Sequence, residues 1–161
     1  MKRFIPILLL LVAGSGVYFY KASPKHPDIS KLSFTLIDGR RITMEQLQGK
    51  PLLVTFWATT CASCIKEIPD LISLYDKYSE MELEIIAVAM PYDRPDHVLE
   101  MVKMHKLPYP IALDIDAKIV RAFGNVRVTP NHFLIAADGN IIKHQIGIID
   151  ISATEQLLRT M

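Results

Sequence analysis

The stretch that decides the fold runs from residue 57 to residue 69 and reads Trp57-Ala-Thr-Thr-Cys61-Ala-Ser-Cys64-Ile-Lys-Glu67-Ile-Pro69. The continuous apolar run at residues 51–56 precedes it, and such a run predicts a strand buried on both faces. Residues 61–78 carry apolar side chains at helical spacing, with a predicted kink at Pro69. The stretch therefore predicts a strand, a turn and a helix that begins at a pair of cysteines.

Segments on both sides of this unit alternate between strand-like and helix-like patterns. Asp38-Gly39 and Asp138-Gly139 each predict the turn of a hairpin. The expected strands cover residues 33–37, 41–43, 51–56, 84–89, 111–113, 131–135 and 141–145, and the expected helices cover 44–47, 61–78, 93–105, 116–123 and 152–159. This order implies a mixed sheet covered by helices, which is a three-layer α/β domain.

The N-terminus reads as a targeting segment over residues 1–21. Lys2 and Arg3 precede residues 4–20, which are seventeen residues without a charge. A basic start followed by an apolar run is typical of a signal peptide or a signal anchor, and this length fits both. We expect export from the cytoplasm, a linker at residues 22–31 and a folded domain at residues 32–161.

The composition excludes several classes of function. The chain has 161 residues with 18 Lys+Arg and 17 Asp+Glu, a formal net charge of +1. A near-neutral domain without a basic run argues against nucleic acid as a partner. Two cysteines can neither build a disulfide-dense scaffold nor supply a four-thiolate zinc site.

The place of the cysteines at a predicted helix start indicates redox chemistry. Unpaired N–H groups and the helix dipole stabilise an anion there, so we expect the pKa of the Cys61 thiol to fall from about 8.5 toward neutrality. Cys61 is then the attacking thiol and Cys64 the resolving thiol. A purely stabilising disulfide over so short a loop would restrict the unfolded chain little. A zinc site would need two more ligands from five histidines that show no recognisable pair.

Trp57 and the two cysteines after a predicted strand, followed later by Thr129-Pro130, resemble the thioredoxin superfamily. The resemblance is closer to the membrane-anchored TlpA/ResA-like thiol-disulfide oxidoreductases of bacteria and covers about residues 32–161. It implies a thioredoxin-like three-layer sandwich with a mixed central sheet, helices on both faces and an N-terminal β-hairpin. It also implies chemistry carried by the cysteine pair, with no cofactor and no metal.

Four further site residues are implied by the resemblance. Pro130 matches the family's cis-proline beside the cysteine pair, and Thr129 would present its backbone to an extended substrate. Glu67 matches a buried acid that shuttles the proton of Cys64. The sequence is equally consistent with a solvent-exposed charge on the surface of the helix. Trp57 matches a wall of the site, and a core aromatic would look identical.

The sequence departs from the family's pattern in two places. Ala62-Ser63 stands between the cysteines where Gly-Pro or a charged residue with Pro is frequent. The absence of a histidine there removes a cation that oxidases use, which favours a reducing potential. Asn131-His132 replaces a small hydroxyl pair after Pro130. The direction of His132 stays open, and an ordinary strand histidine is the favoured interpretation.

These features predict an exported thiol-disulfide reductase. Reduced Cys61 attacks a substrate disulfide, and Cys64 resolves the mixed disulfide. The resemblance implies oxidised periplasmic proteins such as apocytochrome c as substrates and a membrane thiol reductase as electron donor. It also implies an inner-membrane tether through residues 4–20.

A copper-binding or metallochaperone module is an alternative in which Cys61 and Cys64 hold Cu(I). Soft or imidazole ligands also gather on the helix predicted at residues 93–105, namely Met101, Met104, His97 and His105. However, packing is favoured over copper binding because four residues of this helix fall at core-facing spacing, namely Val98, Met101, Val102 and His105.

A thiol peroxidase is the second alternative, because peroxiredoxins share the expected fold. Their pattern resembles Pro-x-x-x-Thr-x-x-Cys around the reactive cysteine. Val54 and Ala58 occupy the Pro and Thr positions relative to Cys61, so this alternative ranks lower.

Overall fold

A computed structural model describes residues 29–78, 80 and 83–161 of the chain. The targeting segment expected at residues 1–21, with its tether at residues 4–20, and most of the linker lie outside these described residues. No helix in the described part of the chain combines the length and the hydrophobicity that crossing a membrane requires.

A five-stranded mixed sheet with the strand order β5-β4-β3-β6-β7 forms the centre of the domain. The central strand β3 (Leu52–Trp57) pairs in parallel with β4 (Glu84–Ala89), which pairs in parallel with β5 (Ile111–Leu113). On its other side β3 pairs antiparallel with β6 (Asn131–Ile135), and β6 pairs antiparallel with β7 (Ile141–Ile146). Parallel strands on one side and a hairpin on the other give the mixed sheet that the alternating pattern predicts.

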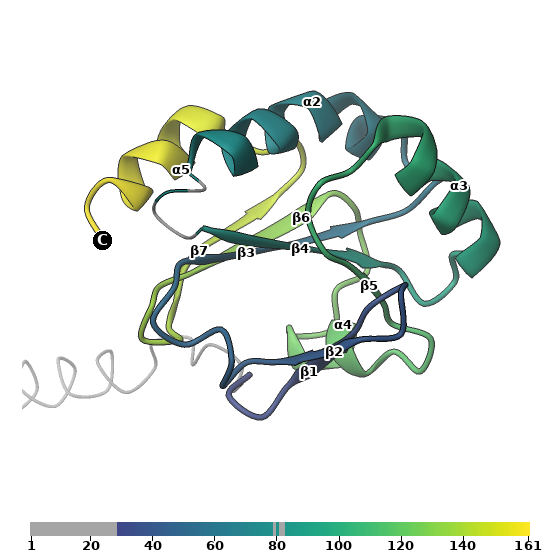
Figure 1. Cartoon of the computed structure of the whole chain (residues 1–161), viewed down its shortest axis with the longest axis horizontal. Helices are drawn as coiled ribbons and strands as arrows, with labels where there is room; N and C mark the ends of the chain where they lie inside the picture. Colours follow the sequence, from purple (N-terminus) through teal and green to yellow (C-terminus); the bar gives the residue numbers. More distant parts are fainter. Residues whose placement is uncertain (1–28, 79, 81–82) are drawn as a thin grey trace, which may run out of the picture.

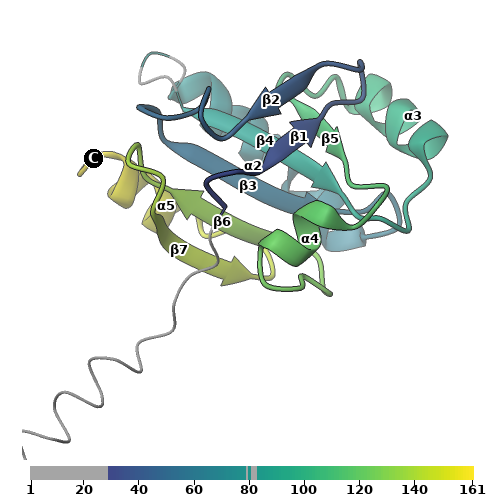
Figure 2. The ribbon, with the colours of Figure 1, turned by 90° about the horizontal axis from the view of Figure 1, so that it is seen from below.

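Helices and a hairpin cover the two faces of this sheet and confirm the three-layer prediction (Figure 1). The face that we call the α2 face carries α2 (Ala62–Lys77), α3 (Pro95–His105) and α5 (Ile151–Leu158). Figure 2 shows the opposite face, the α4 face, with α4 (Lys118–Ala122) and the hairpin of β1 (Ser33–Thr35) and β2 (Arg41–Thr43).

Side chains of β3 alternate between the two cores, and every one of them is buried. Leu52, Val54 and Phe56 pack into the core of the α4 face, and Leu53 and Trp57 pack into the core of the α2 face. Each large apolar side chain buried in this way stabilises the fold by about 1.5–3 kcal/mol. The continuous apolar run at residues 51–56 therefore reflects a strand with no face toward water.

The helix predicted at residues 44–47 is wrong, because residues 44–49 form successive turns. The N–H of Gln46 donates to Thr43 O at 3.1 Å and that of Leu47 donates to Met44 O at 3.2 Å, so these bonds span three residues. Thr43 still caps the segment, since its Oγ1 accepts from the Gln46 N–H. Gly49 at φ +87° then turns the chain away before a bond of the α-helical type, spanning four residues, can form.

Helix α4 is shorter than the predicted span of residues 116–123. Ala117 stands before it in the left-handed region with φ 57°, and α4 begins after it at Lys118. The buried carboxylate of Asp114 accepts the N–H groups of Ile119 and Val120 at 2.9 and 2.8 Å. A side chain outside the helix therefore satisfies donors that the first turn leaves unpaired.

Candidate active site

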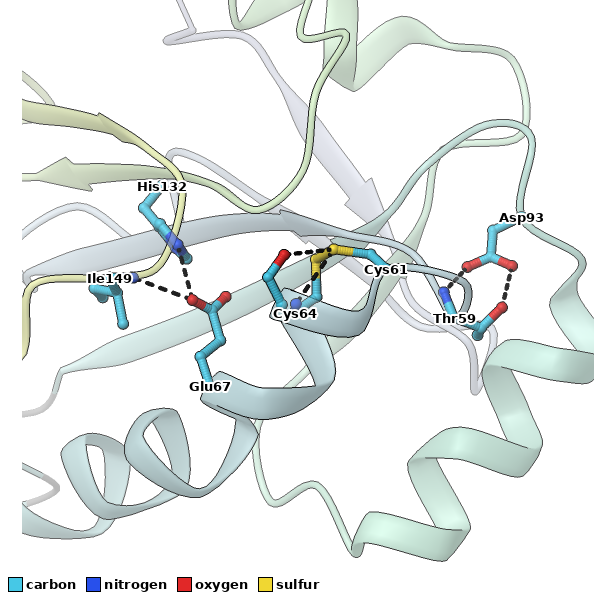
Figure 3. Close-up of a disulfide and its surroundings, with 8 residues drawn as sticks. Thr59, Cys61, Cys64, Glu67, Asp93, His132 and Ile149 are labelled. Carbon is cyan, nitrogen blue, oxygen red and sulfur yellow. Dashed lines mark hydrogen bonds and ion pairs between the residues drawn. A yellow bond between two sulfur atoms is a disulfide. The ribbon is translucent and has the colours of Figure 1, made fainter.

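The two cysteines lie where β3 ends and α2 begins (Figure 3). Cys61 is the N-cap residue of α2, and the N–H of Cys64 donates to Cys61 Sγ at 3.2 Å. The two residues form a disulfide with their Cα atoms 5.3 Å apart. Cys61 is partly exposed, whereas Cys64 is only 2% exposed. A partner can therefore reach the outer sulfur, while the inner sulfur is shielded by the helix.

The loop that delivers Cys61 to the helix is fastened by Asp93. The backbone N–H and the hydroxyl of Thr59 donate to the two oxygens of the Asp93 carboxylate at 2.6 and 2.7 Å. Asp93 follows β4, and both parallel strands end at the same edge of the sheet. Sequence reasoning missed Asp93, because a contact across 34 residues leaves no local signal.

Thr129 and Pro130 lie at the same edge of the sheet as the cysteines. The bond between them is cis, the isomer that the resemblance implied. β6 begins directly after Pro130, and Asn131 pairs with Phe56 one residue before the end of β3. Pro130 is buried and its carbonyl accepts the N–H of Gly147 at 2.9 Å, whereas Thr129 is half-buried.

Glu67 lies inside the protein, directly behind the disulfide. It follows Cys64 by three residues, so both side chains project from one face of α2. Glu67 is 1% exposed, and its Oε2 accepts the backbone N–H of Ile149 at 3.1 Å. The solvated helix charge that the sequence left open does not describe this carboxylate.

His132 points toward Glu67 in Figure 3, which resolves the direction that the sequence left open. Its Nε2 lies 3.3 Å from Glu67 Oε2, and the ring is 3% exposed. β6 places His132 directly opposite Thr55 of β3, and paired residues share one face of a sheet. The favoured interpretation of an ordinary strand histidine therefore missed a buried contact with an acid. Thr55, a polar residue within the apolar run of β3, is the one signal that could have marked this face.

A small cavity of about 10 Å³ lies within the α2-face core and is lined by Cys64 and Glu67. Its size is that of a single water molecule. Its polar lining comes from Thr55, Trp57, Cys64, Glu67 and Tyr109. Trp57 is thus a wall of this cavity as well as a core aromatic. Burial raises the pKa of the Tyr109 hydroxyl, and the charge of Glu67 raises it further, so Tyr109 stays protonated beside the carboxylate.

The candidate copper ligands on α3 do not share one environment. Met101 and Val102 pack against the core of the α2 face, whereas Met104 is 72% exposed and His97 is exposed. Within the residues that the structure describes, no group of three or more His, Cys, Asp and Glu side chains is arranged to hold a metal ion.

A disulfide at the start of the helix that follows the central strand of this fold defines a thiol-disulfide oxidoreductase of the thioredoxin fold. The chain belongs to the Redoxin family, whose model matches residues 21–158. It is 35% identical over 153 residues to the thiol-disulfide oxidoreductase ResA of Bacillus anthracis. The alignment covers 89% of this chain and 87% of ResA. The resemblance to TlpA/ResA-like proteins is thereby confirmed.

Solved structures agree with this assignment. A thioredoxin-like protein from Neisseria meningitidis superimposes with a TM-score of 0.77 at 30% identity, covering 84% of this chain and 90% of that one. StoA from Bacillus subtilis superimposes with a TM-score of 0.66 at 26% identity, and the superposition covers 80% of this chain and 93% of StoA.

Proposed function

We propose that the chain is a protein-disulfide reductase that works outside the cytoplasm and is tethered to the inner membrane by residues 4–20. The observation that carries the reaction is the asymmetry of the cysteine pair, with Cys61 at the accessible helix start and Cys64 buried behind it. The apolar run after Lys2 and Arg3 supports the location.

The reaction proceeds in two thiol-disulfide exchanges. The Cys61 thiolate attacks one sulfur of a substrate disulfide, and the other substrate sulfur leaves as a thiolate. Cys64 then loses its proton and attacks the Cys61 sulfur, which forms the Cys61–Cys64 bond and releases the second substrate thiolate. The substrate gains two electrons, its two thiolates take up protons from water, and a dithiol donor returns the pair to the reduced state.

Glu67 has the position to accept the proton of Cys64. Bulk water does not reach the buried inner sulfur, and Glu67 lines the same cavity as Cys64. A carboxylate in this place serves as general base when Cys64 attacks and as general acid when the donor reduces the pair again. Glu67 therefore belongs with Cys61 and Cys64 among the proposed catalytic residues.

Substrate contact is assigned to Thr129, which is half-buried, with Pro130 and Trp57 as buried walls behind it. Thr129 lies just ahead of the ladder that begins at Asn131, so its backbone can pair with an extended segment of a substrate. Its neighbour Val128 is 52% exposed and offers an apolar contact beside that backbone. Such a surface suits unfolded or loosely folded oxidised proteins, and apocytochrome c is the candidate substrate. A membrane thiol reductase is the candidate donor.

A trapping experiment tests this function. Cys64→Ser in the full chain cannot resolve its mixed disulfide, so it should accumulate covalent partners in cells, and mass spectrometry identifies them. Cys61→Ser is the matched control and should trap none through the outer sulfur. Recovery of exported proteins with cysteine pairs and of a membrane dithiol protein is the expected outcome. Partners confined to the cytoplasm would refute the location.

The reducing direction has a separate test. We expect a reduction potential well below that of strong periplasmic oxidants, which lies at about −120 mV. The potential is obtained by equilibrating the Cys61–Cys64 pair with glutathione buffers and quantifying the dithiol. A value near that of those oxidants would reverse the proposed direction.

A further inference from the structure

Buried polar atoms without a partner gather around Glu67. Four buried side-chain atoms in the described part of the chain lack a hydrogen bond, namely Thr55 Oγ1, Trp57 Nε1 and both ring nitrogens of His132. Thr55 and Trp57 line the cavity that Glu67 lines, and His132 Nε2 lies at ion-pair distance from Glu67 without the alignment of a hydrogen bond. Native proteins leave few such groups, so their concentration in one place indicates a role beyond packing.

A second small cavity is lined by His132. It also has a volume of about 10 Å³, the size of one water molecule. Its polar lining consists of His132, Lys143, Gln145 and Thr154, from β6, β7 and α5. Lys143 and Gln145 are half-exposed, so this second cavity lies next to the surface. Cys64 and Glu67 thus share the first cavity, Glu67 lies 3.3 Å from His132, and His132 lines the second cavity.

We propose that Glu67 and His132 form a proton relay that connects Cys64 with solvent on the side of β7 and α5. The inference rests on the proposed role of Cys64 as the resolving thiol. His132 acts through Glu67 and does not touch the sulfur, which makes it a positioning residue.

The relay moves one proton for each resolution step. The Cys64 thiol gives its proton to the Glu67 carboxylate, and the resulting thiolate forms the bond to Cys61 while the bond from Cys61 to the substrate breaks. Glu67 passes the proton to Nε2 of His132, and Nδ1 of the same ring releases a proton to water at the second cavity. Reduction of the pair by the donor dithiol runs these transfers in reverse, so atoms and charge balance over the cycle.

Besides Glu67 and His132, three ionisable groups among the described residues face the relay, and they leave Glu67 and His132 as the groups that carry the proton from Cys64. Cys64 faces it from α2, Tyr109 from the segment ahead of β5, and Lys143 from β7, while α5 contributes the uncharged Thr154. Tyr109 stays protonated, and Lys143 lies 3.3 Å from the Thr154 hydroxyl at the outer end. An imidazole ring has two nitrogens, so it can receive a proton at one and release a proton from the other.

Single-turnover kinetics of the full-length reduced protein test the relay. A model disulfide is mixed with the protein, and quenched samples give the rate of mixed-disulfide formation at Cys61 and the rate of its resolution across pH 5–9. We expect His132→Gln to slow resolution about tenfold at pH 7, to leave attack by Cys61 unchanged, and to flatten the pH profile as Glu67→Gln does. The double variant should be no slower than Glu67→Gln alone, because residues in one relay are not additive.

Matched variants keep the result interpretable. His132→Thr introduces the small hydroxyl frequent in the family and should show the same slow resolution if His132→Gln fails to fold. His144→Gln removes a histidine from β7 outside both cavities and should leave both rates unchanged. Resolution at the wild-type rate in the His132 variants, or losses that multiply in the double variant, would overturn the relay. Failure of the wild-type protein to form the mixed disulfide would instead overturn the proposed function.

Discussion

Asp93 holds Thr59, two residues ahead of Cys61, through both of its carboxylate oxygens. The bonds from the Thr59 N–H and hydroxyl are 2.6 and 2.7 Å long. The two residues leave neighbouring parallel strands, β3 and β4, at the same edge of the sheet. The loop that carries the reactive sulfur is therefore fixed from outside its own segment.

Removing this carboxylate should weaken both the loop and the fold. Asp93→Ala leaves the Thr59 N–H without its charged acceptor, so we expect the free energy of unfolding to fall by about 1.5–3 kcal/mol. Thr59→Val keeps the backbone bond and should cost about 1 kcal/mol. Urea unfolding of the oxidised proteins measures both. Equal losses in the two variants would show that the backbone bond contributes nothing.

Alkylation of Cys61 across pH tests the effect of the helix start. In the reduced protein the rate for Cys61 should rise with a midpoint below about 8.5, because the first turn of α2 stabilises the thiolate. The same protein unfolded in denaturant serves as its own control, with a midpoint near the ordinary value. Identical profiles for the folded and unfolded protein would contradict the proposed nucleophile.

Substitution of Glu67 should separate the two exchanges. Glu67→Gln keeps an oxygen for the Ile149 N–H but cannot take up a proton, so resolution by Cys64 should slow by about 10²-fold at pH 7 while attack by Cys61 continues. Single-turnover kinetics measure both steps. Asp70→Asn changes an exposed acid on the same helix and should leave both steps unaltered. An equal slowing by both substitutions would mean that the rate of resolution depends on the net charge of α2 and not on the buried acid.

Asp114 should give the fold a pH dependence that runs opposite to acid denaturation. Burial raises the pKa of its carboxyl above the ordinary value of 3.8, and the N–H groups of Ile119 and Val120 only partly offset this. The folded state therefore binds the proton more tightly, so this contribution is full below pH 3.8 and is lost as pH rises through the raised pKa. We expect the stability of the wild type relative to Asp114→Asn to fall over that interval and then to stay constant, as followed by urea midpoints.

Asp150 should give the stability of the fold a pH dependence of the opposite sign. The N–H of Ala153 and the hydroxyl of Ser152 lower the pKa of this N-cap carboxyl. Its contribution is thus present above pH 3.8 and is lost as pH falls through the lowered pKa. The melting temperature of Asp150→Asn should lie below that of the wild type at pH 7 and approach it in acid. Slopes of the same sign for Asp114 and Asp150 would contradict these assignments.

The unit of β3 and α2 could be predicted from the sequence because its signals are local. An apolar run of strand length and helical spacing after Cys61 require no knowledge of the rest of the chain. The prediction of a helix at residues 44–47 is wrong because a capping threonine and a terminating glycine fit successive turns as well as they fit a short helix. The direction of the His132 side chain could not be predicted from residues 131–135 by themselves, because a shift of one residue in register reverses every side chain of a strand. Only its pairing with Thr55 fixes that facing.

The partners of Glu67 are supplied late in synthesis. His132 and Ile149 both come from the last third of the chain, whereas the two sulfurs belong to its first half. A nascent chain that emerges N-terminus first thus displays its dithiol before the histidine behind it exists. The buried surroundings of Glu67 can therefore be completed only after the last third of the chain has been made.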